Sequence, residues 1–126
     1  MGIYGVGIDL VRIERLERSL NKWGLRFRQR LFTPWEIEHC SRRKNCVSCL
    51  ALRFAAKEAF AKALGTGIRE PLSWLDIEVR NHSQGKPEIR LSPRAFEFCR
   101  DRGICSWHLS LTDDGAYGVA VVVLEH

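Results

Sequence analysis

The chain has 126 residues, of which 45% are hydrophobic and 28% charged. Both values are typical of a globular protein with its own core, and the length predicts a single domain over residues 1–126. No apolar run is long enough to cross a bilayer, and the N-terminus lacks the pattern of a secretory signal. These features argue against a membrane protein and predict a cytoplasmic one.

The net charge of +5 is concentrated in one short segment. Residues 11–30 hold seven basic and two acidic side chains, an excess equal to that of the whole chain. We therefore expect an acidic partner for this segment, which can be a nucleic acid, an anionic membrane or an acidic protein.

Residues 3–11 alternate along the chain, which predicts a strand with two different faces. One face is nearly bare, so another element or a ligand can approach the backbone closely there. Its only functional side chain, Asp9, is either part of a site or the cap of the following helix. The bare face carries Gly5, Gly7 and Asp9, and the other face carries Tyr4, Val6, Ile8 and Leu10.

A helix is predicted from about residue 12 to residue 23, with an apolar and a basic side. The apolar side is expected in the core. The basic side is either a solvated face or a docking surface. The concentration of the net charge in this segment supports a docking surface. The apolar side consists of Ile13, Leu16, Leu20 and Trp23, and the basic side of Arg15, Arg18 and Lys22.

Five cysteines, an odd number in a chain large enough to have a core, argue against a disulfide framework. Cys46 and Cys49 form a CxxC with His39 and Cys40 just upstream, so a structural zinc site is conceivable. The second CxxC pair that would make the signal strong is absent. Cys49 also falls at the start of a core helix, where packing is the simpler explanation.

The segment 50–67, LALRFAAKEAFAKALGTG, predicts a long helix followed by a glycine-rich turn. Apolar residues cover most of its circumference, which is typical of a helix buried in the middle of a domain. Glu58 lies inside an apolar stripe, and Lys62 follows it by one helical turn, so the two can pair. A core helix with one internal Glu–Lys pair is the simplest interpretation of this segment.

The remaining elements alternate between hairpins and short helices. Thr33-Pro34-Trp35-Glu36 predicts a helix start with a capping box. The alternation in residues 75–80 and 88–91 predicts an antiparallel hairpin with one solvated face. Ser92-Pro93 opens a helix that turns Ala95, Phe98 and Cys99 inward and that Gly103 ends.

A second hairpin is predicted from residues 107–112 and 117–124, with its turn at residues 113–115. Its last strand is apolar on both faces, so we expect it at the centre of a sheet or covered by another subunit. The order of elements predicts an α+β fold in which an antiparallel sheet packs around the long central helix.

Two carboxylates stand out from this pattern, Asp9 on the glycine-lined strand and Glu58 on the buried helix. Two carboxylates and few other protein ligands suit Mg²⁺, which usually takes further ligands from water and substrate phosphate. Lys62 is placed to contact the same phosphate, and the backbone of residues 65–67 offers N–H groups to an anion. The spacing matches neither a P-loop nor a dinucleotide fingerprint.

These motifs closely resemble the holo-(acyl-carrier-protein) synthases, the small bacterial class of 4′-phosphopantetheinyl transferases. The most specific match is the run KEAFAKALGTG, and the resemblance extends in order along the whole chain. The matching stretches are residues 5–11, 30–33 with Glu36, 53–67, 85–87 and 108–112.

The resemblance implies transfer of 4′-phosphopantetheine from coenzyme A to a serine of apo acyl carrier protein, with release of 3′,5′-ADP, in fatty acid biosynthesis. Asp9 and Glu58 would hold Mg²⁺ on the pyrophosphate, and Glu58, or a metal-bound water that it orients, would accept the serine proton. Lys62 would stabilise the pyrophosphate. The nucleotide would be lined by Arg53, Lys62, Gly65, Gly67, Lys86 and Pro87.

The family also implies partners. Arg15, with Arg18 and Lys22 on the same basic side, would pair with an acidic helix of the carrier protein. A homotrimer with active sites between subunits would be the assembly, and neither a nucleic acid nor a membrane would be a partner.

One position departs from the family pattern. Many members have a histidine near the coenzyme A phosphates, where this chain has Asp113, which would repel an anion. We therefore assign Asp113 no phosphate role and consider the neighbouring Thr112 for coenzyme A binding. Two alternatives remain open: a basic nucleic-acid-binding module without catalysis, and a purely structural oligomer. The first would explain the arginine-rich helix but not a buried glutamate beside a glycine-lined aspartate, and the second would tolerate Glu58→Gln.

Overall fold

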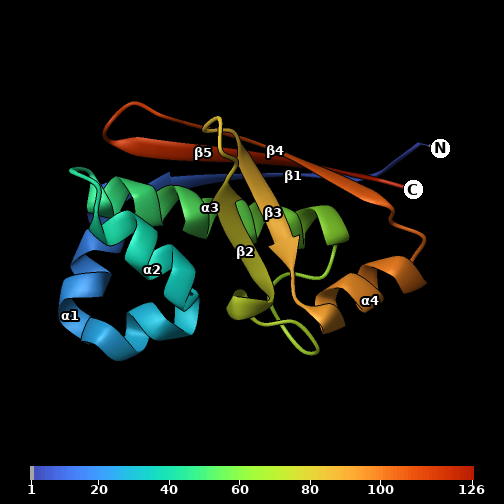
Figure 1. Cartoon of the computed structure of the whole chain (residues 1–126), viewed down its shortest axis with the longest axis horizontal. Helices are drawn as coiled ribbons and strands as arrows, with labels where there is room; N and C mark the ends of the chain where they lie inside the picture. Colours follow the sequence, from blue (N-terminus) through green and yellow to red (C-terminus); the bar gives the residue numbers. More distant parts are fainter. Residues whose placement is uncertain (1) are drawn as a thin grey trace.

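The computed structural model describes residues 2–126 and has the order of elements that the sequence predicts (Figure 1). A short 3-10 helix, η1 (Trp74–Asp76), precedes the first hairpin and takes up Leu75, which we expected in the strand. No helix within the described residues is both long and apolar enough to cross a membrane. The strands are β1 (Ile3–Arg12), β2 (Ile77–Asn81), β3 (Pro87–Leu91), β4 (Ser106–Asp113) and β5 (Tyr117–Glu125), and the helices are α1 (Ile13–Leu31), α2 (Pro34–Ser41), α3 (Cys46–Leu64) and α4 (Pro93–Asp101).

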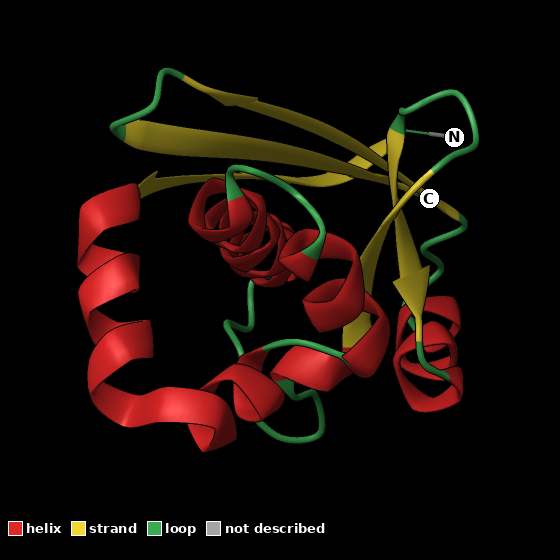
Figure 2. Cartoon of the chain, turned by 60° about the vertical axis from the view of Figure 1, so that its left-hand side comes forward, coloured by secondary structure: helices red, strands yellow, loops and turns green. Residues whose placement is uncertain are grey.

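The strands form two antiparallel sheets rather than one. The larger has the order β1-β5-β4, which places β5 at its centre as its two apolar faces predict. The hairpin β2-β3 forms the smaller sheet. Figure 2 shows α3 between the three-stranded sheet on one side and helices α1 and α2 on the other. The predicted α+β architecture around a central helix is confirmed.

The contact between β1 and α3 depends on the two glycines of the strand. A methyl group on Gly7 would overlap the carbonyl oxygen of Ala59 and lie 2.8 Å from the nitrogen of Ala63. One on Gly5 would overlap the carbonyl oxygen of Ala63. The bare face of β1 is therefore filled by the backbone of α3, an approach that only glycine permits.

Helix α1 differs from its prediction in length and in one core residue. Ile13, Leu16 and Leu20 are buried as expected, but Trp23 is 61% exposed. Gly24 has a φ of 73° and interrupts the helix, so the regular spacing that would carry the apolar face onward ends at Trp23. The continuation to Leu31 brings Leu31 back into the core.

The cysteines differ from both sequence interpretations, because Cys40 and Cys49 form a disulfide. The end of α2 folds back on the first turn of α3, which brings their Cα atoms to 5.5 Å, a distance that suits a disulfide. This bond removes Cys49 from any zinc set. Cys46, Cys99 and Cys105 are free thiols.

A buried ion pair joins α2 to α3. The Nζ of Lys57 lies 2.6 Å from Oε1 of Glu36, and neither side chain is exposed to solvent. Lys57 also donates to the carbonyl oxygens of Leu31 and Trp74. Burial lowers the pKa of Lys57, while the charge and hydrogen bond of Glu36 oppose this change. The pair thus holds three segments against the central helix.

Glu36 serves three partners at once. The predicted capping box is present, with Glu36 accepting from the backbone of Thr33 and Thr33 accepting from that of Glu36. The second carboxylate oxygen of Glu36 accepts from the Val79 backbone N–H at 2.8 Å. Glu36 therefore connects α2, α3 and β2.

We expect Gly7→Ala to lower the free energy of unfolding by about 3 kcal/mol or more, because the methyl group would force β1 away from the α3 backbone. Gly24→Ala is the control. It meets open space and bears only the strain of a positive φ, so we expect a loss of about 1 kcal/mol. Urea denaturation measures both, and equal losses would contradict the steric account.

We expect Lys57→Met to destabilise the protein by about 3–5 kcal/mol, because Glu36 would remain buried without its partner. Adding Glu36→Gln should recover part of this loss, because the unpaired charge is then absent. Thermal and urea denaturation measure the cycle, with Lys44→Met in the exposed linker as control. If Lys57→Met behaved like Lys44→Met, the buried pair would not be a structural tie.

Candidate active site

Asp9, Glu58 and Lys62 form one cluster at the contact between β1 and α3. Asp9 follows Gly7 on the face of β1 that α3 covers, and its side chain is 15% exposed. The Nζ of Lys62 donates to Oδ1 of Asp9 and to the carbonyl oxygen of Ile8, each at 3.0 Å. The sequence predicted that Lys62 could pair with Glu58, whereas its ion pair in the structure is with Asp9.

Glu58 shares the electrostatic environment of this cluster. Burial raises the pKa of Glu58, the negative charge of Asp9 raises it further, and Lys62 opposes the change. The two carboxylates therefore interact directly through space, although 49 positions separate them in the sequence. The cluster combines two carboxylates with one ammonium group.

The glycine turn after α3 does not present free N–H groups. Gly65 has a left-handed φ of 83° and caps the helix, donating to the carbonyl oxygens of Ala61 and Lys62. The N–H groups of Thr66 and Gly67 also donate to Ala61. The expectation that this backbone offers donors to an anion is therefore wrong for this structure, because the donors close the end of α3.

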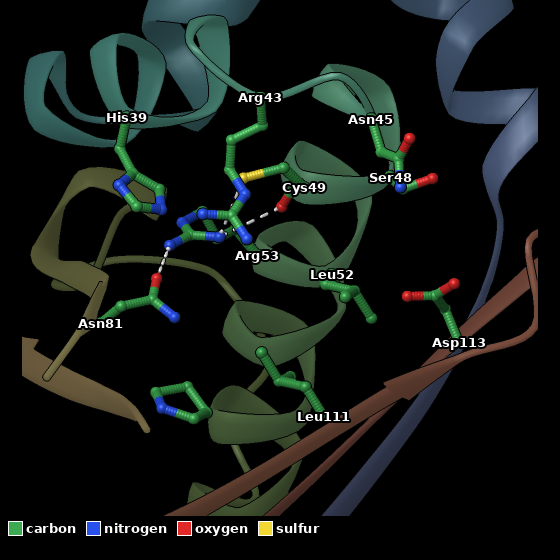
Figure 3. A pocket seen from close by; sticks show the side chains of 11 residues that line it. His39, Arg43, Asn45, Ser48, Cys49, Leu52, Arg53, Asn81, Leu111 and Asp113 are labelled. Carbon is green, nitrogen blue, oxygen red and sulfur yellow. Dashed lines mark hydrogen bonds between the residues drawn. The ribbon is translucent and has the colours of Figure 1, made fainter. Parts of the chain in front are cut away.

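Arg53 lies in a separate pocket of about 260 Å³, the arginine pocket (Figure 3). Its guanidinium is nearly buried and donates to the carbonyl oxygen of Val79 at 3.3 Å and to Oδ1 of Asn81 at 2.5 Å. Helix α3 positions it against the end of β2. The pocket is lined by His39, Arg43, Asn45, Ser48, Cys49, Leu52, Arg53, Asn81, Pro87, Leu111 and Asp113.

This pocket carries an excess of positive charge, because Arg43 and Arg53 line it with a single carboxylate, Asp113. Burial lowers the pKa of Arg53, with Glu36 opposing and Arg43 adding to the shift. Burial likewise lowers the pKa of His39, and Arg53 and Arg43 lower it further. Among residues 2–126, neither Arg43 nor Arg53 forms an ion pair with a carboxylate. A phosphate would meet complementary charge here.

The carboxylate cluster and the arginine pocket lie on different sides of α3. Arg53 and Glu58 are five residues apart, which corresponds to about 140° around a helix. Lys86 lines a second groove of about 470 Å³, next to Pro87, His82 and Trp107. The structure thus brings Asp9, Glu58 and Lys62 together, but it does not bring Arg53 or Lys86 to them within one chain.

Thr112 lies on a third surface, the outer face of the three-stranded sheet. It alternates with Leu111, which turns inward, and pairs with Val119 across the strands. The same face exposes an apolar stripe on β1, where Val6, Ile8 and Leu10 are 58–62% exposed. The partners of this stripe on β5 are Val123, Val121 and Val119.

The predicted carrier-binding residues Arg15, Arg18 and Lys22 are all exposed along α1. Lys22 stacks its ammonium over the exposed Trp23 ring at 5.0 Å from the centroid. The basic side of α1 is therefore open to a partner, with an aromatic ring beside it.

Sequence reasoning missed three residues of the arginine pocket, His39, Arg43 and Asn81. They belong to the α2 end, a linker and the end of a strand, and no local pattern places the three of them in one pocket. Their shared position becomes visible only when α2 folds back on α3.

A family model described as the 4′-phosphopantetheinyl transferase superfamily matches residues 5–122. The chain belongs to this superfamily. A holo-(acyl-carrier-protein) synthase of Trichlorobacter lovleyi is 50% identical over 123 residues, which are 98% of each chain. The relatives confirm the resemblance seen in the sequence, and with it the enzyme class of phosphopantetheinyl transferases.

Solved structures agree with the sequence relatives. The crystal structure of holo-(acyl-carrier-protein) synthase from Neisseria meningitidis superimposes with a TM-score of 0.94 at 40% identity, covering 99% of this chain and 100% of that chain. The Helicobacter pylori synthase, solved in complex with coenzyme A, gives a TM-score of 0.85 at 36% identity, with coverage of 95% and 99%. The fold is therefore that of the holo-(acyl-carrier-protein) synthases.

Proposed function

We propose that this chain, acting as one domain in the cytoplasm, transfers 4′-phosphopantetheine from coenzyme A to a serine of apo acyl carrier protein. The reaction depends on Mg²⁺, releases 3′,5′-ADP and serves fatty acid biosynthesis. The observation that carries the proposal is the meeting of Asp9, Glu58 and Lys62 in a chain of this family. Coenzyme A as co-substrate is supported by the relative solved in complex with it.

The donor chemistry of the cluster fits Mg²⁺. No group of three or more His, Cys, Asp and Glu side chains in residues 2–126 is arranged to hold a metal ion. The two carboxylates of Asp9 and Glu58 suit a hard cation that completes its shell with water and phosphate oxygens. When bound, Mg²⁺ would neutralise charge on the pyrophosphate during phosphoryl transfer.

The protein side chains have distinct roles in this proposal. Asp9 and Glu58 hold the cation, and Lys62 holds a pyrophosphate oxygen from the side of Asp9. The serine hydroxyl gives its proton to Glu58, either directly or through water. A carboxylate within reach of the reacting hydroxyl can serve as this base.

The nucleotide end of coenzyme A is assigned to the arginine pocket. Arg53 supplies charge, and Pro87 and Lys86 border the pocket and the adjoining groove. Gly65 and Gly67, which follow Lys62 at the end of α3, are assigned to contacts with the same coenzyme A. Because Arg53 and Glu58 face different sides of α3, one coenzyme A molecule is proposed to contact two copies of the chain.

A homotrimer is the assembly we propose. The exposed apolar stripe on the outer sheet face supports contact with another copy, because stripes of this kind mark interaction surfaces. Thr112 lies on the same face and would approach coenzyme A bound by the neighbouring copy. Asp113 lines the arginine pocket and weakens its attraction for phosphate, so it receives no binding role.

We expect Asp9→Ala and Glu58→Ala to fold normally and to lower the transfer rate by at least about 100-fold. The assay incubates the protein with coenzyme A, Mg²⁺ and an apo carrier protein and then weighs the carrier by mass spectrometry. Chelation should stop the wild-type reaction and added Mg²⁺ should restore it. Glu97→Ala, on the exposed side of α4, is the control and should retain full activity. A Glu58 variant with full Mg²⁺-dependent activity would count against the assignment.

We expect Arg15→Glu to raise KM for the carrier protein about 10-fold or more while leaving KM for coenzyme A nearly unchanged. The reason is that the exposed basic side of α1 then carries a charge that repels an acidic helix. Arg100→Glu, an equal change on α4, is the control. Comparable loss toward both substrates would contradict a carrier-docking role, and tight salt-dependent binding of RNA or DNA without metal would favour the nucleic-acid alternative.

A further inference from the structure

The Cys40–Cys49 disulfide forms part of the wall of the arginine pocket. Cys40 lies in the last turn of α2 and is fully buried, whereas Cys49 lies in the first turn of α3 and lines the pocket. Figure 3 shows the side chain of Cys49 beside those of Arg43 and Arg53. A small reagent in the pocket can therefore reach Cys49 rather than the fully buried Cys40.

Arg53 connects this sulfur to the opposite wall. Its Nη1 lies 3.2 Å from Sγ of Cys49 and donates to the carbonyl oxygen of the same residue at 3.4 Å. Its Nη2 donates to Oδ1 of Asn81 on the hairpin side. The position of the guanidinium thus depends on the disulfide at one end and on β2 at the other.

Helix α2 is held unequally at its two ends. Thr33 and Glu36 bind its first turn to Lys57, Glu78 and Val79. At its last turn the disulfide is the specific tie to α3, because no side-chain hydrogen bond or ion pair joins residues 39–41 to α3 in the described chain. Breaking the disulfide therefore removes this tie from the end of α2, from His39 and from the linker that carries Arg43, and leaves the packing of Cys40 in the core to hold them.

We propose that Cys40–Cys49 is a reversible thiol–disulfide exchange site that sets the affinity of the arginine pocket for the nucleotide of coenzyme A. This inference rests on the function proposed above. The disulfide form presents His39 and Arg43 beside Arg53 as one preorganised wall, and the dithiol form releases that wall. Cysteine pairs in proteins of reducing compartments are commonly of this redox-sensing kind.

The exchange requires a dithiol as reductant. One thiolate of the dithiol attacks Sγ of Cys49, the Cys40–Cys49 bond breaks, and Cys40 leaves as a thiolate that takes up a proton. The second thiolate then attacks the reagent sulfur of the mixed disulfide and releases Cys49. The guanidinium of Arg53 stabilises the departing Cys49 thiolate. The protein gains two electrons and two protons, and the dithiol becomes a cyclic disulfide.

The effect should fall on binding rather than on chemistry. Asp9 and Glu58 lie across α3 from Cys49 and share no contact with it, so the rate of the bound complex should be kept. Loss of preorganisation in a few side chains typically weakens binding by roughly 3- to 10-fold.

The test compares oxidised and dithiothreitol-treated wild-type protein. Thiol titration in denaturant should count three free thiols before treatment and five after it. Calorimetry with coenzyme A should show Kd rising roughly 3- to 10-fold on reduction, and the carrier assay should show KM for coenzyme A rising with kcat unchanged. Cys40→Ser should bind like reduced wild type and ignore dithiothreitol, whereas Cys46→Ser should respond like wild type.

Each outcome decides the inference. Equal Kd values in the two redox states, or a response that Cys46→Ser abolishes, would overturn it. A fall in kcat with KM unchanged would also overturn it, because the disulfide would then act on the carboxylate cluster. If oxidised wild type transferred no phosphopantetheine, the proposed function would fail instead, and the calorimetric comparison would still judge the redox effect separately.

Discussion

The close approach of β1 to α3 is the constraint on which the structure depends. Gly5 and Gly7 let the strand lie directly on the backbone of the helix. This close contact brings Asp9 near Glu58 and Lys62. A side chain at either glycine would separate the two carboxylates as well as the two elements. Stability and the candidate chemistry therefore rest on the same two positions, which explains why such a bare strand face lies inside an otherwise apolar core.

The opposite side of α3 is governed by charge rather than by close packing. Lys57 and Glu36 are buried together, and each satisfies further backbone groups, so the pair links α2, β2 and the helix at one point. Arg53 lies one turn earlier on α3, where the charge of Glu36 opposes the lowering of its pKa by burial. Its guanidinium lines the arginine pocket. One helix thus carries a carboxylate cluster on one side and a cationic pocket on another.

Local patterns in the sequence predict most of the fold. The alternation in β1, the two apolar faces of β5, the capping box at Thr33 and the helix opened by Ser92-Pro93 are local signals, and all are present in the structure. The pairing of Asp9 with Glu58 was suggested by the residues around them and became specific only through the motifs of a family. Trp23 was misread because of a kink at Gly24, and Cys40 because α2 returns onto α3. Helical periodicity in the sequence shows neither feature.

The separation of the two sites on α3 bears on the proposed assembly. Side chains about 140° apart on a helix point in different directions, so Arg53 and Glu58 of one chain cannot contact the same small group of a ligand. The outer sheet face leaves Val6, Ile8 and Leu10 exposed, which is costly for an isolated chain but useful for a surface that meets another copy. An extended substrate with a pyrophosphate in its middle and a nucleotide at one end fits such an arrangement, since each copy would supply one half of a composite site.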